Sequence, residues 1–188
     1  MHKSRCSWVT TDPLYIAYHD EEWGRELHDS QKLFELLCLE GQQAGLSWFT
    51  ILKRRSGMRE VYDGFDPEKL SCWTDSKIDS VSKDERIIRH RLKVEAVVKN
   101  AKAYLELTGK GINFSTWIWS FSPTQPIEYS EIYRTKSLES DSLSKALKKA
   151  GFNFCGSTIC YAFMQACGMV DDHMEGCWRY QKNDNISR

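Results

Sequence analysis

Apolar residues recur at the spacing of an α-helix along most of this chain, and no clear pair of segments alternates between apolar and polar residues as strands would. The longest periodic run covers residues 85–107 and ends before Gly109, a residue type that commonly follows a helix. An Asp followed by Pro, which often starts a helix, precedes two of the shorter runs, at Asp12 and Asp66. The sequence therefore predicts an all-α protein.

Glycine, proline and polar residues separate the expected helices. Gly41 and Gly45 interrupt the pattern that begins after Asp29 or Ser30, and residues 122–139 are interpreted as a loop across the surface. We expect a helix whose apolar face covers 33–39, and two short helices that begin at Asp66 and Thr74. The other helical segments that we expect are 14–20, 46–52, 85–107, 142–150 and 157–167.

The 188 residues, 41% of them hydrophobic, suit a single domain over 1–188 or one domain built from two lobes. The 26 Lys and Arg balance 26 Asp and Glu, which excludes bulk positive charge as the means of holding nucleic acid but allows a local basic face. We expect no membrane partner, because no apolar stretch approaches the ~20 residues that span a bilayer. The polar N-terminus and seven Cys without an export signal predict a cytoplasmic protein with free or metal-bound thiols.

Two pairs of potential metal ligands lie near opposite ends of the chain. Cys6 and His19 are near the N-terminus, and His173 and Cys177 would share one face of a C-terminal helix. Two Cys and two His can complete a tetrahedral zinc site, which would be closed and structural. The spacing alone leaves open that these are core cysteines and surface histidines.

Aromatic residues cluster in the first quarter of the chain: Trp8, Tyr15, Tyr18, Trp23 and Trp48. Flat rings of this kind can sandwich a nucleobase that is flipped out of a duplex. Large aromatic residues also fill protein cores, and on pattern alone we favour the core.

Glu40 interrupts an otherwise apolar helical face within residues 39–48. A buried carboxylate needs a partner, and a purine offers an exocyclic amine and a ring nitrogen. The flanking Gly41 and Gly45 would allow close approach of the backbone. The alternative is a glutamate at a helix end that reaches solvent.

A glycine-bearing hairpin over residues 152–156 leads into the last apolar helix. Backbone N–H groups at Gly156, Ser157 and Thr158 could bind a phosphate, although many helical hairpins have this appearance. Nearby positive charge would come from Lys145, Lys148 and Lys149. A second basic run, residues 86–93, is interpreted as a solvated face.

Together these residues resemble the bacterial 3-methyladenine DNA glycosylase I family, within the helix–hairpin–helix glycosylase superfamily. The resemblance runs from Cys6 to about Trp178. The segments that carry it are 6–8, 12–20, 22–24, 39–48, 87–91 and 151–168.

The resemblance implies a helix–hairpin–helix glycosylase fold, with the hairpin motif at about 141–167, a substrate cleft between two helical lobes and one zinc ion per chain. It implies a base excision repair enzyme that hydrolyses the N-glycosidic bond of 3-methyladenine in alkylated double-stranded DNA. The free base would be released and an abasic site left behind. The enzyme would be a monofunctional, base-flipping monomer acting on the bacterial nucleoid.

The resemblance also implies the roles of individual residues. The implied zinc ligands are Cys6, His19, His173 and Cys177. In the implied base pocket, Glu40 hydrogen-bonds the methylated adenine, Trp48 stacks on it, and Tyr18, Trp8 and Trp23 complete the walls. The implied DNA contacts are Gly156, Ser157 and Thr158 with Lys149 nearby, and Gly45 and Leu46 in the gap left by the flipped nucleotide.

Methylation at N3 puts positive charge on the adenine and so weakens its glycosidic bond. A cationic base over electron-rich rings gains about 1–2 kcal/mol in a desolvated pocket. The matching motifs hold no lysine suited to a Schiff base, so water would be the nucleophile.

Asp171 departs from the family pattern. Many superfamily members have a catalytic Asp at this position, whereas the resembled family often has Asn. Asp171 could restore the catalytic carboxylate, but we favour a cap on the helix expected to carry His173 and Cys177.

A function of another class is a zinc-stabilised DNA-binding or adaptor module without catalysis. The hairpin and the basic residues would serve it equally well. Glu40 and the aromatic set argue against it, because holding DNA does not need a buried carboxylate.

Overall fold

The computed structural model describes residues 3–124 and 134–180. Over these residues the chain is helical and contains no strand, so the all-α prediction is confirmed. The elements are α1 (Pro13–Ala17), a π-helix η1 (Tyr18–Glu22), α2 (Ser30–Gln43), α3 (Trp48–Val61), a 3-10 turn η2 (Asp63–Phe65), α4 (Pro67–Ser71), α5 (Asp75–Val81), α6 (Arg91–Gly109), α7 (Phe114–Trp119), α8 (Leu138–Lys149) and α9 (Ser157–Ala166).

Polar side chains cap the starts of most helices, as the sequence predicted for Asp12, Asp66 and Thr74. Asp29 caps α2, accepting a hydrogen bond from the N–H of Lys32 at 2.8 Å. These caps satisfy N–H groups that have no partner within the helix, and they fix where each helix begins.

Several boundaries differ from the prediction. Helix α6 begins at Arg91 and not at residue 85, because the Asp84 carboxylate accepts the N–H of Arg86 at 2.9 Å and holds a turn. Helix α7 was not predicted; it is short and capped by Asn113. Helix α8 starts at the capping box of Ser137, inside the predicted loop over 122–139, of which residues 125–133 lie outside the described part.

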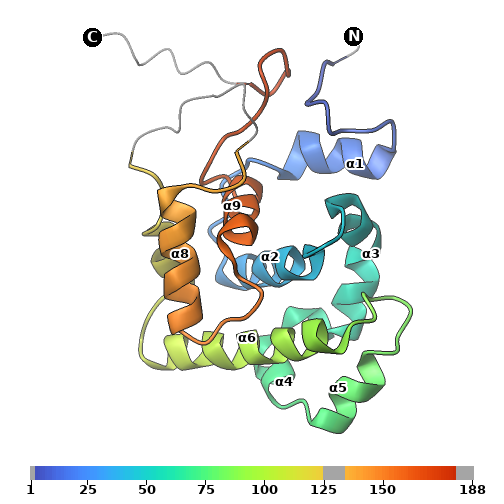
Figure 1. The fold of residues 1–188 in the computed structure, drawn as a ribbon, viewed down its shortest axis with the longest axis vertical. Helices are drawn as coiled ribbons and strands as arrows, with labels where there is room; N and C mark the ends of the chain where they lie inside the picture. Colours follow the sequence, from blue (N-terminus) through green and yellow to red (C-terminus); the bar gives the residue numbers. More distant parts are fainter. Residues whose placement is uncertain (1–2, 125–133, 181–188) are drawn as a thin grey trace.

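The predicted C-terminal helix carrying His173 and Cys177 is wrong, because residues 171–180 form turns and irregular segments. Helix α9 closes at Gly168, which has φ +81° and packs directly against the backbone of residues 25–26. The chain then runs back to its beginning, where the N–H of Trp178 donates to the carbonyl of Ser4 at 2.9 Å. The described ends of the chain therefore lie side by side at one end of the molecule (Figure 1).

Helix α2 lies in the middle of the fold, with α9, α3 and α6 around it (Figure 1). The main apolar core extends from α2 to the segment after α9 and includes buried residues of α6 and α8. A smaller buried cluster lies beside it, where the chain ends meet; its members are Cys6, Tyr18, Trp23, Leu52, Ala166 and Cys177. This smaller cluster contains several of the predicted site residues.

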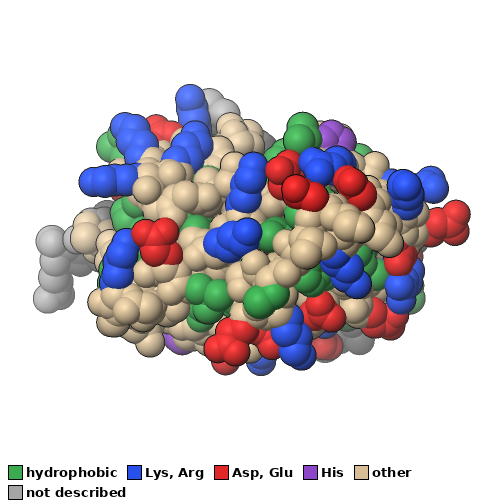
Figure 2. Space-filling view, turned by 90° about the horizontal axis from the view of Figure 1, so that it is seen from below, with side chains coloured by type: hydrophobic (Ala, Val, Ile, Leu, Met, Phe, Trp, Pro, Cys, Tyr) green, Lys and Arg blue, Asp and Glu red, His purple; other side chains and the backbone are tan. Residues whose placement is uncertain are grey.

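Lys and Arg side chains gather on the left of the face shown in Figure 2 and lie among Asp and Glu over the rest of it, although the whole sequence has balanced charge. None of the described helices is both long and apolar enough to cross a lipid bilayer.

Candidate active site

Glu40 lies on the buried side of α2 and is 2% exposed, so the interpretation of a glutamate reaching solvent is wrong. Its Oε2 atom is buried and has no hydrogen-bond partner among the described residues. Burial raises the pKa of the Glu40 carboxyl to about 8. An unpartnered buried acceptor is costly, so the site is suited to a ligand that brings donors or positive charge.

Tyr18 lies near this carboxyl group, and ring contacts connect Tyr18 to the other predicted aromatic residues. The Tyr18 ring is 5.4 Å from the Trp48 ring, measured between centroids, and the pKa of Tyr18 is raised by burial and then by the charge of Glu40. The indole N–H of Trp48 is buried without an acceptor among the described residues. Trp8 and Trp23 lie farther out, with 5.1 Å between their rings and 6.4 Å from Trp8 to Tyr18.

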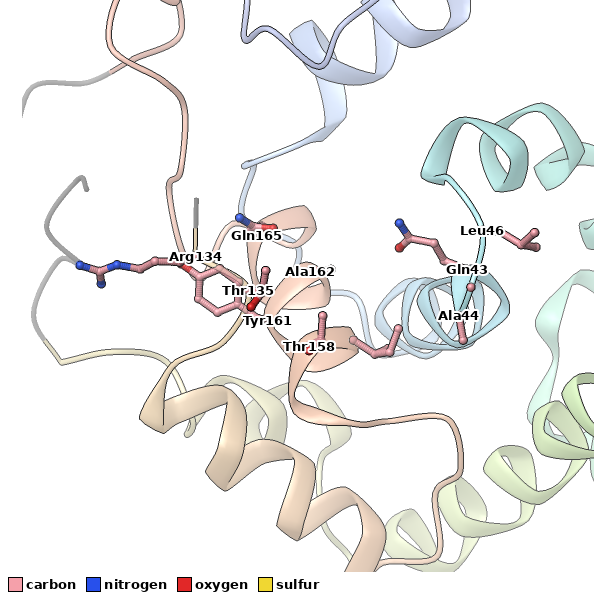
Figure 3. A pocket seen from close by; sticks show the side chains of 11 residues that line it. Gln43, Ala44, Leu46, Arg134, Thr135, Thr158, Tyr161, Ala162 and Gln165 are labelled. Carbon is pink, nitrogen blue, oxygen red and sulfur yellow. The ribbon is translucent and has the colours of Figure 1, made fainter. Parts of the chain in front are cut away.

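A cavity of about 230 Å³ lies between the end of α2 and helix α9. Gln43 and Ala44 face it from α2, whereas Thr158, Ala162 and Gln165 face it from α9 (Figure 3). Gly45 and Leu46 are also among the residues that line the cavity, although the Leu46 side chain points away from Thr158 (Figure 3). The full lining is Gln43, Ala44, Gly45, Leu46, Arg134, Thr135, Thr158, Ile159, Tyr161, Ala162 and Gln165.

The turn after α2 contributes Gly45 and Leu46 to the lining of this cavity. Gly45 adopts φ +76°, a conformation that glycine takes without strain. Leu46 follows and is 41% exposed, although leucine is usually buried. An exposed leucine on a turn beside a cavity is suited to contact a ligand there.

Gly156 precedes α9 and offers no side-chain cap, so the first N–H groups of this helix remain open to an anion. The Ser157 hydroxyl donates instead to Asp141 on α8, which leaves Thr158 as the predicted contact whose side chain lines the cavity. Lys149 is exposed at the end of α8 and does not line the cavity.

Three of the four predicted metal ligands come within 4.8 Å of one another: Cys6, His19 and Cys177. The Cys177 Sγ atom is 3.4 Å from Nε2 of His19. His173 is adjacent, with its ring 5.2 Å from the ring of His19, and its buried Nε2 has no partner among the described residues. Both histidines are almost fully buried, so the interpretation as surface residues is wrong.

Carboxylates hold the outer nitrogen of each histidine. Asp20 lies 2.8 Å from Nδ1 of His19, and Asp171 lies 2.5 Å from Nδ1 of His173. This leaves both Nε2 atoms directed to the interior, the arrangement that carboxylate–histidine–metal sites use. Asp171 also accepts the N–H of His173 at 3.1 Å, so it caps no helix and its carboxylate serves His173.

The sequence did not single out two further polar residues. Asp172 accepts hydrogen bonds from the Tyr161 hydroxyl at 2.7 Å and the Gln165 amide at 2.6 Å, both from cavity-lining residues. No pattern around Asp172 indicated this role. Arg86, Arg89, His90 and Arg91 are exposed, as predicted for the solvated face over 86–93. Lys93 departs from that prediction, because it is only 6% exposed. Its spacing from the apolar Val97 could have indicated burial.

Comparison with known proteins gives a consistent result. Residues 8–180 match the sequence model of a family described as methyladenine glycosylase. The chain is 52% identical over 184 residues to DNA-3-methyladenine glycosylase 1 of Escherichia coli (strain K12), covering 95% of this chain and 98% of the relative.

Solved structures resemble the whole fold. A crystal structure of 3-methyladenine DNA glycosylase I superposes with a TM-score of 0.91 at 48% identity, covering 95% of this chain and 100% of the other. A variant of 3-methyladenine DNA glycosylase I in complex with 3-methyladenine superposes with a TM-score of 0.87 at 38% identity, covering 95% of this chain and 98% of the other.

Proposed function

The chain belongs to the methyladenine glycosylase family, and we propose that it hydrolyses the N-glycosidic bond of 3-methyladenine in alkylated double-stranded DNA. The products are free 3-methyladenine and an abasic site. The unpartnered Oε2 of Glu40 is the observation that carries the proposal, because it provides a buried acceptor beside the Tyr18 and Trp48 rings.

The positive charge of the methylated base compensates the negative charge of an ionised Glu40 carboxylate. We infer that the ionised carboxylate accepts hydrogen bonds from the base and that Trp48 stacks on it, with Tyr18, Trp8 and Trp23 as walls. Normal adenine is neutral and leaves the carboxylate without a compensating charge. The pocket therefore selects the damaged base by charge as well as by shape.

The reaction needs no covalent enzyme intermediate. The bond between the sugar C1′ and the base nitrogen breaks, and its electron pair neutralises the cationic base as it leaves. Water then adds to C1′ and releases a proton, so the enzyme is monofunctional. Glu40 holds the departing base, and its negative charge stabilises positive charge in the transition state.

We propose that Cys6, His19, His173 and Cys177 hold one zinc ion. The fit rests on the orphaned Nε2 of His173, on the short distance between Cys177 and His19, and on the two carboxylates that orient the histidines. Burial raises the pKa of the Cys6 thiol to about 12, so a thiolate there needs a bound cation. With four protein ligands the ion is structural and has no open position for a water molecule.

The proposed DNA interface is a helix–hairpin–helix over about 141–167. Gly156, Ser157 and Thr158 at the start of α9 bind a phosphate, with Lys149 supplying charge, and Gly45 and Leu46 occupy the gap left by the flipped nucleotide. We further propose that the chain is one two-lobed domain with the substrate cleft between the lobes. It acts as a monomer in the bacterial cytoplasm.

A base-release assay tests the proposed function. Wild-type protein is incubated with methylated and with unmethylated duplex DNA, and the free bases are separated and quantified. We expect 3-methyladenine from the methylated duplex alone. A protein that binds both duplexes and releases no base would instead be a DNA-binding or adaptor module without catalysis.

A further inference from the structure

Lys93 joins two helices that are distant in the sequence. Its Nζ atom donates hydrogen bonds to the carbonyl oxygens of Gln42 and Ala44, each at 2.7 Å. The side-chain amide of Gln42 donates in return to the Lys93 carbonyl at 3.0 Å. Three hydrogen bonds thus connect the end of α2 to the first turn of α6.

The chemistry of this contact suits the end of a helix. The last carbonyls of a helix lack intrahelical partners and carry partial negative charge, so a cation satisfies them well. No carboxylate lies within ion-pair distance of Lys93 in the described part of the chain, and burial lowers the pKa of its ammonium group. A buried ammonium bound only by carbonyls adds little stability compared with an apolar residue, so its effect is mainly to fix position.

The position that Lys93 fixes is the start of the turn at the cavity. The second carbonyl that accepts a hydrogen bond from Lys93 belongs to Ala44. Gly45 and Leu46 follow Ala44 directly in the chain. The N–H of Leu46 donates to the carbonyl of Gln43 at 2.7 Å, so the turn is built on the same helix end. Leu46 belongs to the lining of the cavity, and its exposed side chain points away from α9 (Figure 3).

We propose that Lys93 is a positioning residue for duplex DNA, which holds the Gly45–Leu46 turn at the mouth of the cavity so that Leu46 enters the gap left by an extruded nucleotide. This inference rests on the proposed function. It assigns Lys93 to the step in which the duplex is opened. Recognition of the free base stays with Glu40 and Trp48, because the Lys93 ammonium group donates to the carbonyls of Gln42 and Ala44 instead.

A double-mutant cycle tests the proposal, using Lys93→Met, Leu46→Ala and the double variant. The measurement is single-turnover release of 3-methyladenine from methylated duplex. We expect each single change to slow release by about tenfold, and the double variant to be no slower than the slower single. Independent roles would multiply to about a hundredfold, and that result would overturn the proposal.

Lys102→Met is the matched control, because Lys102 is exposed on the same helix and its loss changes the net charge equally. We expect release to stay within about twofold of wild type in this control, and to recover largely in Lys93→Arg. Equal slowing by Lys93→Met and Lys102→Met would reduce the effect to charge and overturn the proposal.

Binding of free 3-methyladenine, followed by tryptophan fluorescence, separates positioning from general damage. Lys93→Met should keep its affinity within about twofold of wild type, whereas equal losses of binding and release would overturn the proposal. If Lys93→Met does not fold, Gln42→Met takes its place in the cycle with Leu46→Ala. This variant removes only the hydrogen bond from the Gln42 side-chain amide to the Lys93 carbonyl. Should wild type release no base, the proposed function itself would fail.

Discussion

At the scale of single residues, the environment of Glu40 decides its chemistry. An ordinary glutamate pKa of 4.5 is raised to about 8 by burial, so the native protein holds a proton that the unfolded chain releases. The stability from this proton is complete below pH 4.5 and falls as pH rises through about 8. A cationic base has the opposite effect, because it favours the ionised carboxylate.

Glu40→Gln tests recognition of the base. It keeps the shape of the side chain but removes the charge and places a donor amide against the exocyclic amine, so release and binding of 3-methyladenine should fall by about tenfold or more. Asp171→Asn is the control, because Asp171 serves His173 and should cost stability rather than activity. Single-turnover release and free-base binding are measured on both variants after folding and zinc content are checked. If Asp171→Asn abolishes release and Glu40→Gln does not, Asp171 and not Glu40 is the carboxylate on which excision depends.

The pH profile of excision should reflect the titration of Glu40. Since the ionised carboxylate binds the cationic base, the single-turnover rate should rise with pH and level off above about 8. Glu40→Gln should lose this rise. The measurement is the second-order rate of release at enzyme concentrations below saturation, which reports the free enzyme, across the pH range. A wild-type profile that stays flat through pH 8 contradicts ionisation of Glu40 as the controlling event.

At the scale of elements, the connection between α8 and α9 is held from both sides. Asn100 on α6 accepts the N–H of Asn153 at 2.7 Å, and Ser144 on α8 donates to the carbonyl of Cys155 at 2.6 Å. These buried bonds fix the path of the chain into Gly156. For the proposed phosphate contact, this fixed path lowers the entropic cost of ordering the start of α9 on binding.

Lys149→Ala tests this element as a DNA contact. With a formal net charge of zero, affinity for undamaged duplex should be weak and its salt dependence modest, because only a local face supplies phosphate contacts. Removing Lys149 should weaken binding and reduce the slope of log affinity against log salt by about one unit. The measurement is a salt titration of duplex affinity, with Lys83→Ala, exposed after α5, as the control. Equal slopes for the two variants would remove Lys149 from the interface.

At the scale of the whole molecule, the cluster of Cys6, His19 and Cys177, which we propose binds zinc, brings together the two described ends of the chain. The ring of Trp23 lies 4.6 Å from the ring of His173 and 5.1 Å from that of Trp8, so the cluster also borders the aromatic set. Chain ends usually fray unless they are tied down. A zinc ion at Cys6, His19, His173 and Cys177 would tie them here.

Loss of zinc should affect stability more than the base pocket. We expect about one zinc per chain, and a fall of several degrees in Tm for Cys177→Ser. Cys72→Ser is the matched control, because Cys72 is exposed and lies far from the cluster in the sequence. Metal analysis and thermal melts make the comparison. Freshly purified protein without zinc, or a chelator that abolishes activity while the fold persists, would contradict a structural ion.

Local sequence determined the helices and most of their starts. The caps at Asp12, Asp29 and Asp66 and the periodic apolar faces act over one or two turns, so they can be read without knowledge of the fold. The family and the chemical types of the candidate site residues could be predicted from the sequence for the same reason. Each motif that carries the family resemblance is a contiguous segment of the chain.

Only the tertiary structure decided which distant groups meet. The return of residues 171–180 to the N-terminus replaced an expected helix, and it placed Asp171 on His173. Lys93 found its partner at the end of α2, which is distant in the sequence. Asp172 found its partner in a side chain of α9, Tyr161. Such contacts depend on where buried surfaces close against each other, and the hydrogen bonds of a buried polar group are set by whichever neighbours packing supplies.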